Sequence, residues 1–162
     1  MVSSELLSIF ISTFTLITLA EIGDKSQLVC MMLAARHRHW PVLLGASIAF
    51  LVLNAVAVIF GVGLAAWAPE RVIAGIVAVL FGAFGIHALR RQDYEVSEDI
   101  TERPGHGIFF STLLLIFVAE FGDKTQIAVA GLAGTLSPLP VWLGASAALV
   151  MVSALGVWAG RT

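Results

Sequence analysis

Long apolar runs, each closed by a short polar or charged stretch, dominate this sequence. A transmembrane helix needs about 20 mainly apolar residues, and several runs reach that length. The polar–apolar alternation of outer-membrane barrel strands is absent. The pattern therefore predicts an all-α membrane protein with five spans, at about residues 6–35, 41–67, 72–89, 107–133 and 141–160.

The first and fourth runs are interrupted by nearly the same charged segment, at an offset of 99 residues. The two copies are Glu21-Ile22-Gly23-Asp24-Lys25-Ser26-Gln27 and Glu120-Phe121-Gly122-Asp123-Lys124-Thr125-Gln126. A charge near the bilayer centre costs about 2.5–3.5 kcal/mol, so these groups must pair, line a wet cavity or hold an ion. The first run would be about 45 Å long as one helix, and it must tilt, protrude or break, with Gly23 a plausible break point.

The same offset aligns residues well beyond the charged segments, without a gap. The matches are Phe10 with Phe109, Ser12-Thr13 with Ser111-Thr112, Pro41-Val42 with Pro140-Val141 and Leu44-Gly45-Ala46-Ser47 with Leu143-Gly144-Ala145-Ser146. The chain therefore contains an internal duplication. An odd number of spans precedes the second copy, so the copies enter the membrane from opposite sides. This predicts an inverted repeat of three-helix units, the plan of many secondary transporters.

The duplication divides the chain into a first repeat (1–91), an acidic cytoplasmic loop (92–106) and a second repeat (107–162). The second repeat lacks its third helix under this alignment. Three explanations are open. The sequence is truncated or processed, a neighbouring subunit of a homo-oligomer supplies the helix, or the fold is stable with five spans.

The positive-inside rule sets the orientation of the predicted spans. The arginines of one side are Arg36, Arg38, Arg90, Arg91, Arg103 and Arg161, and Arg71 falls on the other. The N-terminus is therefore expected outside, and because it lacks a positive n-region, the first run is interpreted as a retained helix. The net charge of −2 gives no basic surface for nucleic acid, and a single cysteine excludes an internal disulfide.

The polar residues of the two segments follow helical spacing, since residues three or four apart share a helix face. Inverted symmetry would bring both faces together near the midplane. The expected metal ligands are Glu21, Asp24, Gln27, Glu120, Asp123 and Gln126, with neutral oxygens available from Ser26, Thr125, Ser47, Ser146 and Asn54. Such an oxygen-rich set suits a hard divalent cation such as Ca²⁺, Mn²⁺ or Mg²⁺.

Charge balance points to exchange of this cation for protons. Four carboxylates with the ammonium groups of Lys25 and Lys124 sum to −2, which one divalent ion or two protons would neutralise. Crowded carboxylates favour proton binding. The lysines act either as counter-charges of the ion-free site or in gating. A simple Glu–Lys pair between helices explains neither the Asp and Gln nor the second copy. An intramembrane aspartyl protease is disfavoured because the lysines would keep the aspartates ionised, so no enzyme is expected.

The doubled Glu-x-Gly-Asp-Lys-[Ser/Thr]-Gln motif resembles the cation/proton exchanger family of bacterial manganese exporters and Golgi manganese/calcium transporters. The resemblance covers nearly the whole chain. It implies a multi-pass carrier with two inverted three-helix repeats that moves Mn²⁺ or Ca²⁺ against protons, with Glu21, Asp24, Glu120 and Asp123 as ligands assisted by both glutamines. We expect Mn²⁺ export, and no cofactor. Short loops suggest a bacterial inner-membrane member. Ca²⁺/H⁺ exchange at the same site is the alternative, and a divalent cation channel a remote one. The absent sixth span departs from the family pattern.

Overall fold

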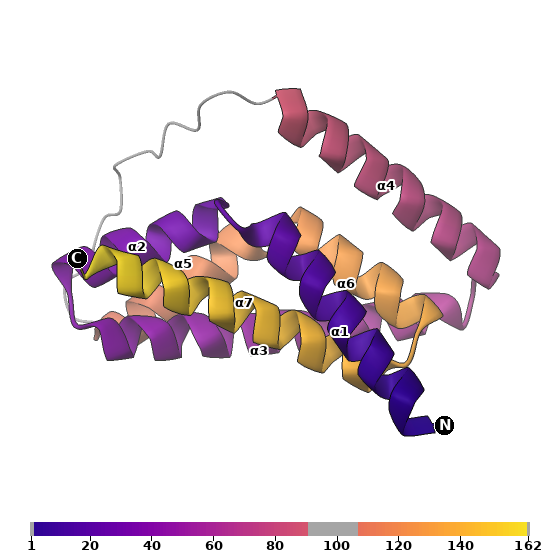
Figure 1. Ribbon diagram of the computed structural model, residues 1–162, viewed down its shortest axis with the longest axis horizontal. Coiled ribbons are helices and arrows are strands. Elements are labelled where there is room, and N and C mark those ends of the chain that lie inside the picture. The colour runs from indigo at the N-terminus through magenta and orange to yellow at the C-terminus, as the bar shows by residue number, and fades with distance from the viewer. Residues whose placement is uncertain (1, 91–106, 162) are drawn as a thin grey trace.

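The computed structural model describes residues 2–90 and 107–161, so the predicted acidic loop at 92–106 lies outside the described residues. The described residues form helices and no strands (Figure 1). In chain order the helices are α1 (Val2–Glu21), α2 (Lys25–Arg36), α3 (His39–Ala65), α4 (Glu70–Arg90), α5 (Ile108–Glu120), α6 (Lys124–Thr135) and α7 (Pro138–Gly160).

Several helices have the length and surface of membrane-spanning elements. Among the described residues, Ser3–Glu21, His39–Ala65 and Pro138–Gly160 are each long and apolar enough to cross a bilayer, and Ile108–Glu120 is a shorter apolar helix. Large apolar side chains such as Leu19, Ile59 and Trp67 are exposed on the outside of the bundle. An apolar exterior of this extent suits lipid rather than water. The predicted class, an all-α membrane protein, is therefore confirmed.

The first and fourth predicted spans are each broken inside the charged segment. Gly23 has φ +84° and Gly122 has φ +79°, a left-handed backbone that glycine adopts without steric cost. α1 ends at Glu21, and α2 begins at Lys25 with Asp24 as its N-cap. The expected break at Gly23 is confirmed. The prediction that all polar residues of the motif share one helix face is wrong. The helix is interrupted at the glycine, so residues before and after it belong to different helices.

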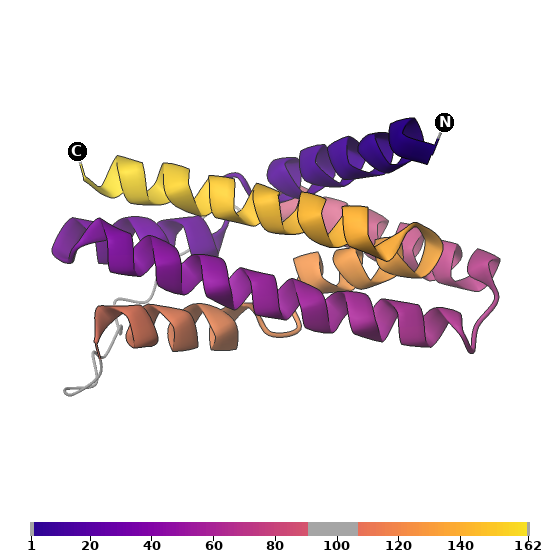
Figure 2. The same cartoon turned by 90° about the horizontal axis from the view of Figure 1, so that it is seen from below.

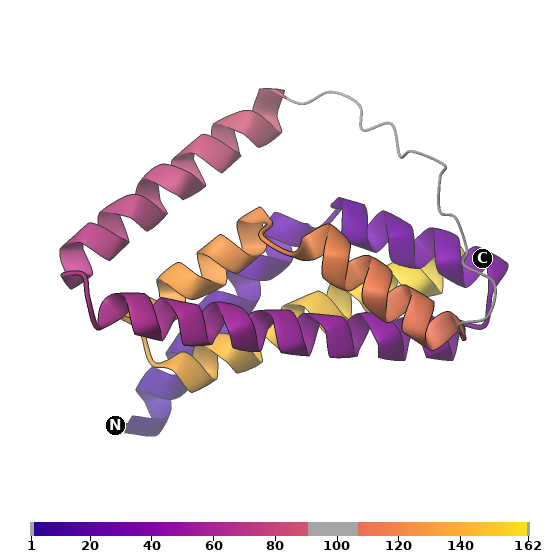
Figure 3. The same ribbon diagram turned by 180° about the vertical axis from the view of Figure 1, so that it is seen from behind.

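The two broken helices run in opposite directions through the bundle (Figures 1 and 2). α1 packs against α7 as α5 packs against α3, and α2 packs against α7 as α6 packs against α3. The long helices α3 and α7 contact each other in the centre. α4 packs on α6 near its own start and then diverges from the other helices (Figure 3). The packing thus places both breaks beside the central helix pair.

Glycines bring the outer helices into backbone contact with the central pair. A Cβ atom on Gly45 of α3 would lie 2.6 Å from the carbonyl oxygen of Phe109 in α5. A Cβ atom on Gly144 of α7 would lie 2.7 Å from the carbonyl oxygen of Phe10 in α1. Small residues at helix crossings permit such an approach in membrane proteins. Both the glycines and their partners are related by the offset of 99 residues.

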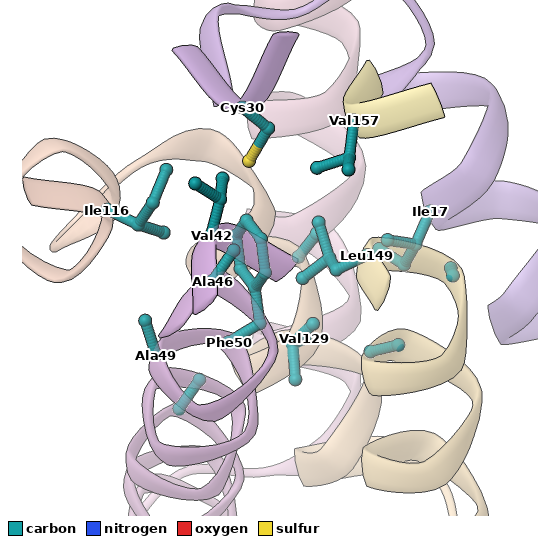
Figure 4. Packing of buried hydrophobic residues seen from close by; sticks show 14 of the residues in the cluster. Ile17, Cys30, Val42, Ala46, Ala49, Phe50, Ile116, Val129, Leu149 and Val157 are labelled. Carbon is teal, nitrogen blue, oxygen red and sulfur yellow. The ribbon is translucent and has the colours of Figure 1, made fainter. Parts of the chain in front are cut away.

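Small and branched side chains fill the centre of the bundle. Phe50 of α3 lies beside Leu149 of α7, and Ile17 of α1 lies on the far side of Leu149 (Figure 4). One buried polar link joins the central helices, because the Asn54 side-chain amide donates to Ser146 Oγ at 3.1 Å. The core therefore holds the two central helices in a fixed relation, on which the geometry at the breaks depends.

Candidate metal centre

Three carboxylates from the two breaks form a compact cluster inside the bundle. Glu21, Asp24 and Asp123 each offer an oxygen atom, and these oxygens lie within 4.8 Å of one another. Oxygens that share a cation at 2.3–2.6 Å are at most about 5 Å apart, so the spacing fits one ion. Glu21 is completely buried, and the two aspartates are partly buried. The cluster draws two members from the first motif and one from the second.

Glu21 has one oxygen engaged and one without a partner. It is the last residue of α1, and Thr125 from the start of α6 donates its hydroxyl to Glu21 Oε1. Glu21 Oε2 is buried and has no hydrogen-bond partner among the described residues. Burying a polar oxygen without a partner is unfavourable. The free oxygen is therefore available to a bound ligand.

A lysine of the second motif neutralises an aspartate of the first. Lys124 Nζ lies 2.7 Å from Asp24 Oδ2, and the aspartate side chain is only 9% exposed. A cation that binds the same oxygen of Asp24 must displace this ammonium group. Lys25, the equivalent of Lys124 in the first motif, has an exposed side chain. The two predicted counter-charges thus occupy different surroundings.

The remaining predicted ligands lie in the same region with other contacts. Glu120 is 5% exposed but is not one of the three clustered carboxylates. Gln27 Oε1 accepts a hydrogen bond from the Gly23 amide at 2.7 Å, and Gln126 Oε1 accepts one from the Gly122 amide at 3.0 Å. The glutamines therefore fix the shape of both breaks. Their role as ion ligands, like that of Glu120, stays a prediction.

The neutral oxygens named from the sequence have varied surroundings. Thr125 contacts Glu21 as described, and Ser26 is buried. Ser47 donates to the Leu43 carbonyl at 2.7 Å. Asn54 and Ser146 bond each other in the central helix pair. Of this set, Thr125 is placed to orient a clustered carboxylate.

Sequence reasoning missed a buried hydroxyl in α1. Thr18 lies one helical turn before Glu21 and is 9% exposed, and its hydroxyl has no partner among the described residues. Sequence reasoning also gave the glutamines no structural task. Two signals were available: a polar residue one turn before the glutamate in an apolar run, and a glutamine four residues after each glycine.

The fold and this cluster together define a class of protein. Broken helices that meet inside an apolar bundle, with ionisable groups at the breaks, are the arrangement of ion-transporting secondary carriers. An all-oxygen donor set is the kind that hard divalent cations prefer.

The chain matches the GDT1 family, described as divalent cation/proton antiporters, over residues 9–95 and 108–162. The chain therefore belongs to the GDT1 family. This membership confirms the resemblance that the doubled motif carries.

Similar proteins come from bacteria and plants. The chain is 30% identical over 153 residues to the "Putative manganese exporter" of Vibrio cholerae, covering 94% of this chain and 75% of that protein. It is 31% identical over 176 residues to GDT1-like protein sll0615 of Synechocystis, covering 96% and 84%. It is 28% identical over 178 residues to GDT1-like protein 3 of Arabidopsis thaliana, covering 92% of this chain but 59% of that protein. No solved structure matches the chain.

Proposed function

We propose that this protein exports Mn²⁺ in exchange for protons through the cluster of Glu21, Asp24 and Asp123. The observation that carries the proposal is the convergence of three carboxylate oxygens within 4.8 Å at the meeting point of two broken helices. The antiporter family supplies the reaction class. The name of the Vibrio cholerae relative supports manganese as the ion. Glu120, Gln27 and Gln126 are further candidate ligands beside this cluster.

Exchange follows from competition for the same oxygen atoms. A metal ion needs deprotonated ligands, so its binding releases protons, and proton binding in turn displaces the metal. Lys124 forms an ion pair with Asp24. Arrival of a divalent cation would release this ammonium group. The site would thus alternate between a form neutralised by protons and lysine and a form neutralised by metal.

The topology that we propose consists of five spans in two inverted repeats, 1–91 and 107–162, with the N-terminus outside a bacterial plasma membrane. The opposite directions of the two broken helices support it (Figures 1 and 2). The equivalent packing of α1 on α7 and α5 on α3 supports it further. In this arrangement each repeat contributes one break to a shared site, and small relative movements of the repeats would open it to alternate sides.

Transport by purified protein in liposomes tests this proposal. We expect Mn²⁺ uptake that depends on an imposed pH gradient and is lost in Asp24→Asn. Glu5→Gln is the matched control, because Glu5 is an exposed carboxylate near the start of α1. Unchanged uptake by Asp24→Asn would contradict the site. Rapid flux that ignores the pH gradient would instead indicate a channel.

Ca²⁺/H⁺ exchange at the same site is the second candidate. The observation that favours it is the donor set, in which every clustered atom is a carboxylate oxygen. Hard oxygen ligands serve Ca²⁺ as well as Mn²⁺. Competition by Ca²⁺ against Mn²⁺ uptake in the same liposomes separates the two ions. Manganese export predicts that excess Ca²⁺ leaves most of the Mn²⁺ uptake intact.

A further inference from the structure

Two buried oxygen atoms on one side of α1 lack hydrogen-bond partners among the described residues. They are the Thr18 hydroxyl and Glu21 Oε2. Thr18 is 9% exposed and Glu21 is 0% exposed, so neither group lies open to the surroundings. Residues three apart on a helix are neighbours on its surface, one turn from each other. The two atoms therefore lie on adjoining parts of the same helix side.

The Thr18 hydroxyl lacks the hydrogen bond that a threonine in a helix usually makes, as does the buried Thr13 hydroxyl earlier in α1, but Thr18 alone of the two is one turn from Glu21. Such hydroxyls commonly donate to a carbonyl one turn earlier. Thr112 does so to Ile108 at 2.8 Å, and Thr135 does so to Gly131 at 3.2 Å. A buried hydroxyl without a partner is unfavourable, and such groups in native structures call for a bound water or ion. Thr18 is thus free to serve a ligand.

The carboxylate cluster needs additional oxygen ligands. It supplies three oxygens, whereas hard divalent cations take about six to eight. Thr125 already donates to Glu21, and Asn54 is bonded to Ser146. Building on the proposed function, we propose that Thr18 completes the ion site. Its hydroxyl and the free oxygen of Glu21 together bind the divalent cation, either directly or through one water of its coordination shell.

The proposal makes the two halves of the site unequal. At the offset of 99 residues, Phe117 occupies the place of Thr18 and offers no oxygen. The cluster itself shows the same bias, because Glu21 and Asp24 come from the first motif and Asp123 alone comes from the second. The cation would therefore lie nearer the α1–α2 break than the α5–α6 break.

Hydroxyl removal at nearly constant volume tests the proposal. Thr18→Val loses the oxygen, Thr18→Ser keeps it, and Thr112→Val is the control because its hydroxyl bonds its own helix. The Mn²⁺ dissociation constant is measured on purified protein from the electron paramagnetic resonance signal of free Mn²⁺. Thr18→Val should raise it about tenfold, corresponding to about 1.4 kcal/mol. Thr18→Ser and Thr112→Val should stay within about twofold of the wild type.

Two outcomes would overturn the role of Thr18. One is wild-type Mn²⁺ affinity in Thr18→Val, and the other is equal weakening by Val and Ser, which would indicate a packing effect. Thermal unfolding of each variant without metal confirms that it folds like the wild type. Glu21→Gln, measured in parallel, reports on the proposed site itself. Loss of affinity in Glu21→Gln with none in Thr18→Val would reject this inference alone, whereas absence of wild-type binding would reject the proposed function as well.

Discussion

The two broken helices share their local structure but not their contacts. Gly23 and Gly122 have nearly the same left-handed backbone, and a glutamine accepts a hydrogen bond from each glycine amide. Glu21 nevertheless receives the Thr125 hydroxyl and joins the carboxylate cluster, whereas Glu120 is buried outside it. The same seven-residue motif thus dictates the same turn twice. The role of each carboxylate depends on what the rest of the bundle places beside it.

The lysines of the two motifs differ in burial. Lys124, whose ammonium group pairs with Asp24 of the other motif, is partly buried, and Lys25 is exposed. Their helices also differ in packing, because α4 covers part of α6 and places Val77 directly against Gly131. A duplicated site therefore becomes asymmetric through its neighbours, and variants of equivalent residues measure that asymmetry.

The largest difference is expected between the two glutamates. Glu21→Gln should weaken Mn²⁺ binding about a hundredfold, because it removes the charge of a clustered ligand. Glu120→Gln should weaken binding about tenfold or less, because Glu120 lies outside the cluster of three carboxylates. Isothermal titration calorimetry of both variants measures the contrast. Equal losses would mean that the ion is held symmetrically.

Substitutions at the two equivalent helix crossings, by contrast, should lower stability by similar amounts. Gly45→Ala and Gly144→Ala each push a methyl group against a backbone carbonyl, and each should lower stability by about 1–3 kcal/mol. Gly63→Ala in α3 is the control, since its Cβ would meet no atom within 4 Å. Denaturant unfolding in detergent measures the loss. A loss in one crossing only would show that the equivalent contacts are not of equal importance.

Substituting Gly23 or Gly122 should lower stability by a smaller amount, and by about the same amount at both positions. Alanine at Gly23 or Gly122 meets no atom within 4 Å, so its cost is the left-handed backbone alone, about 1–2 kcal/mol. Thermal unfolding checks this, and asparagine, which tolerates that backbone better, should recover part of the loss. A cost that asparagine does not reduce would point to a cause other than backbone strain.

The effects of the two lysines on the metal-induced shift in melting temperature are expected to be unequal. Lys124→Gln removes the ion-pair partner of Asp24, whose side chain is only 9% exposed, so the ion-free protein should melt earlier. Added Mn²⁺ should then raise the melting temperature more than in the wild type, because no ammonium group competes for Asp24. Lys25→Gln should leave this metal-induced shift closer to the wild-type value. The reverse order would reject the competition between Lys124 and the cation.

Local patterns predicted most of the fold. The apolar runs indicated a helical membrane protein because burial in lipid depends on composition and length, and the doubled motif indicated the family. Helix ends were predicted to within a few residues. α7 begins at Pro138 rather than near 141, since proline is accepted in the first turn of a helix. The break at Gly23 could be anticipated because glycine tolerates the conformation that interrupts a helix.

Residue type and spacing along the chain were enough to predict the membrane class, the duplication, the break at Gly23 and the set of six candidate ligands. How these six residues divide between the carboxylate cluster and other contacts depends on packing between distant parts of the chain. Glu21, Asp24 and Asp123 converge, and both glutamines bond the backbone of the breaks. Because the two motifs are nearly identical, their local sequence cannot predict which carboxylates join the cluster. The difference arises from contacts such as that of Thr125 with Glu21, which join residues 104 positions apart.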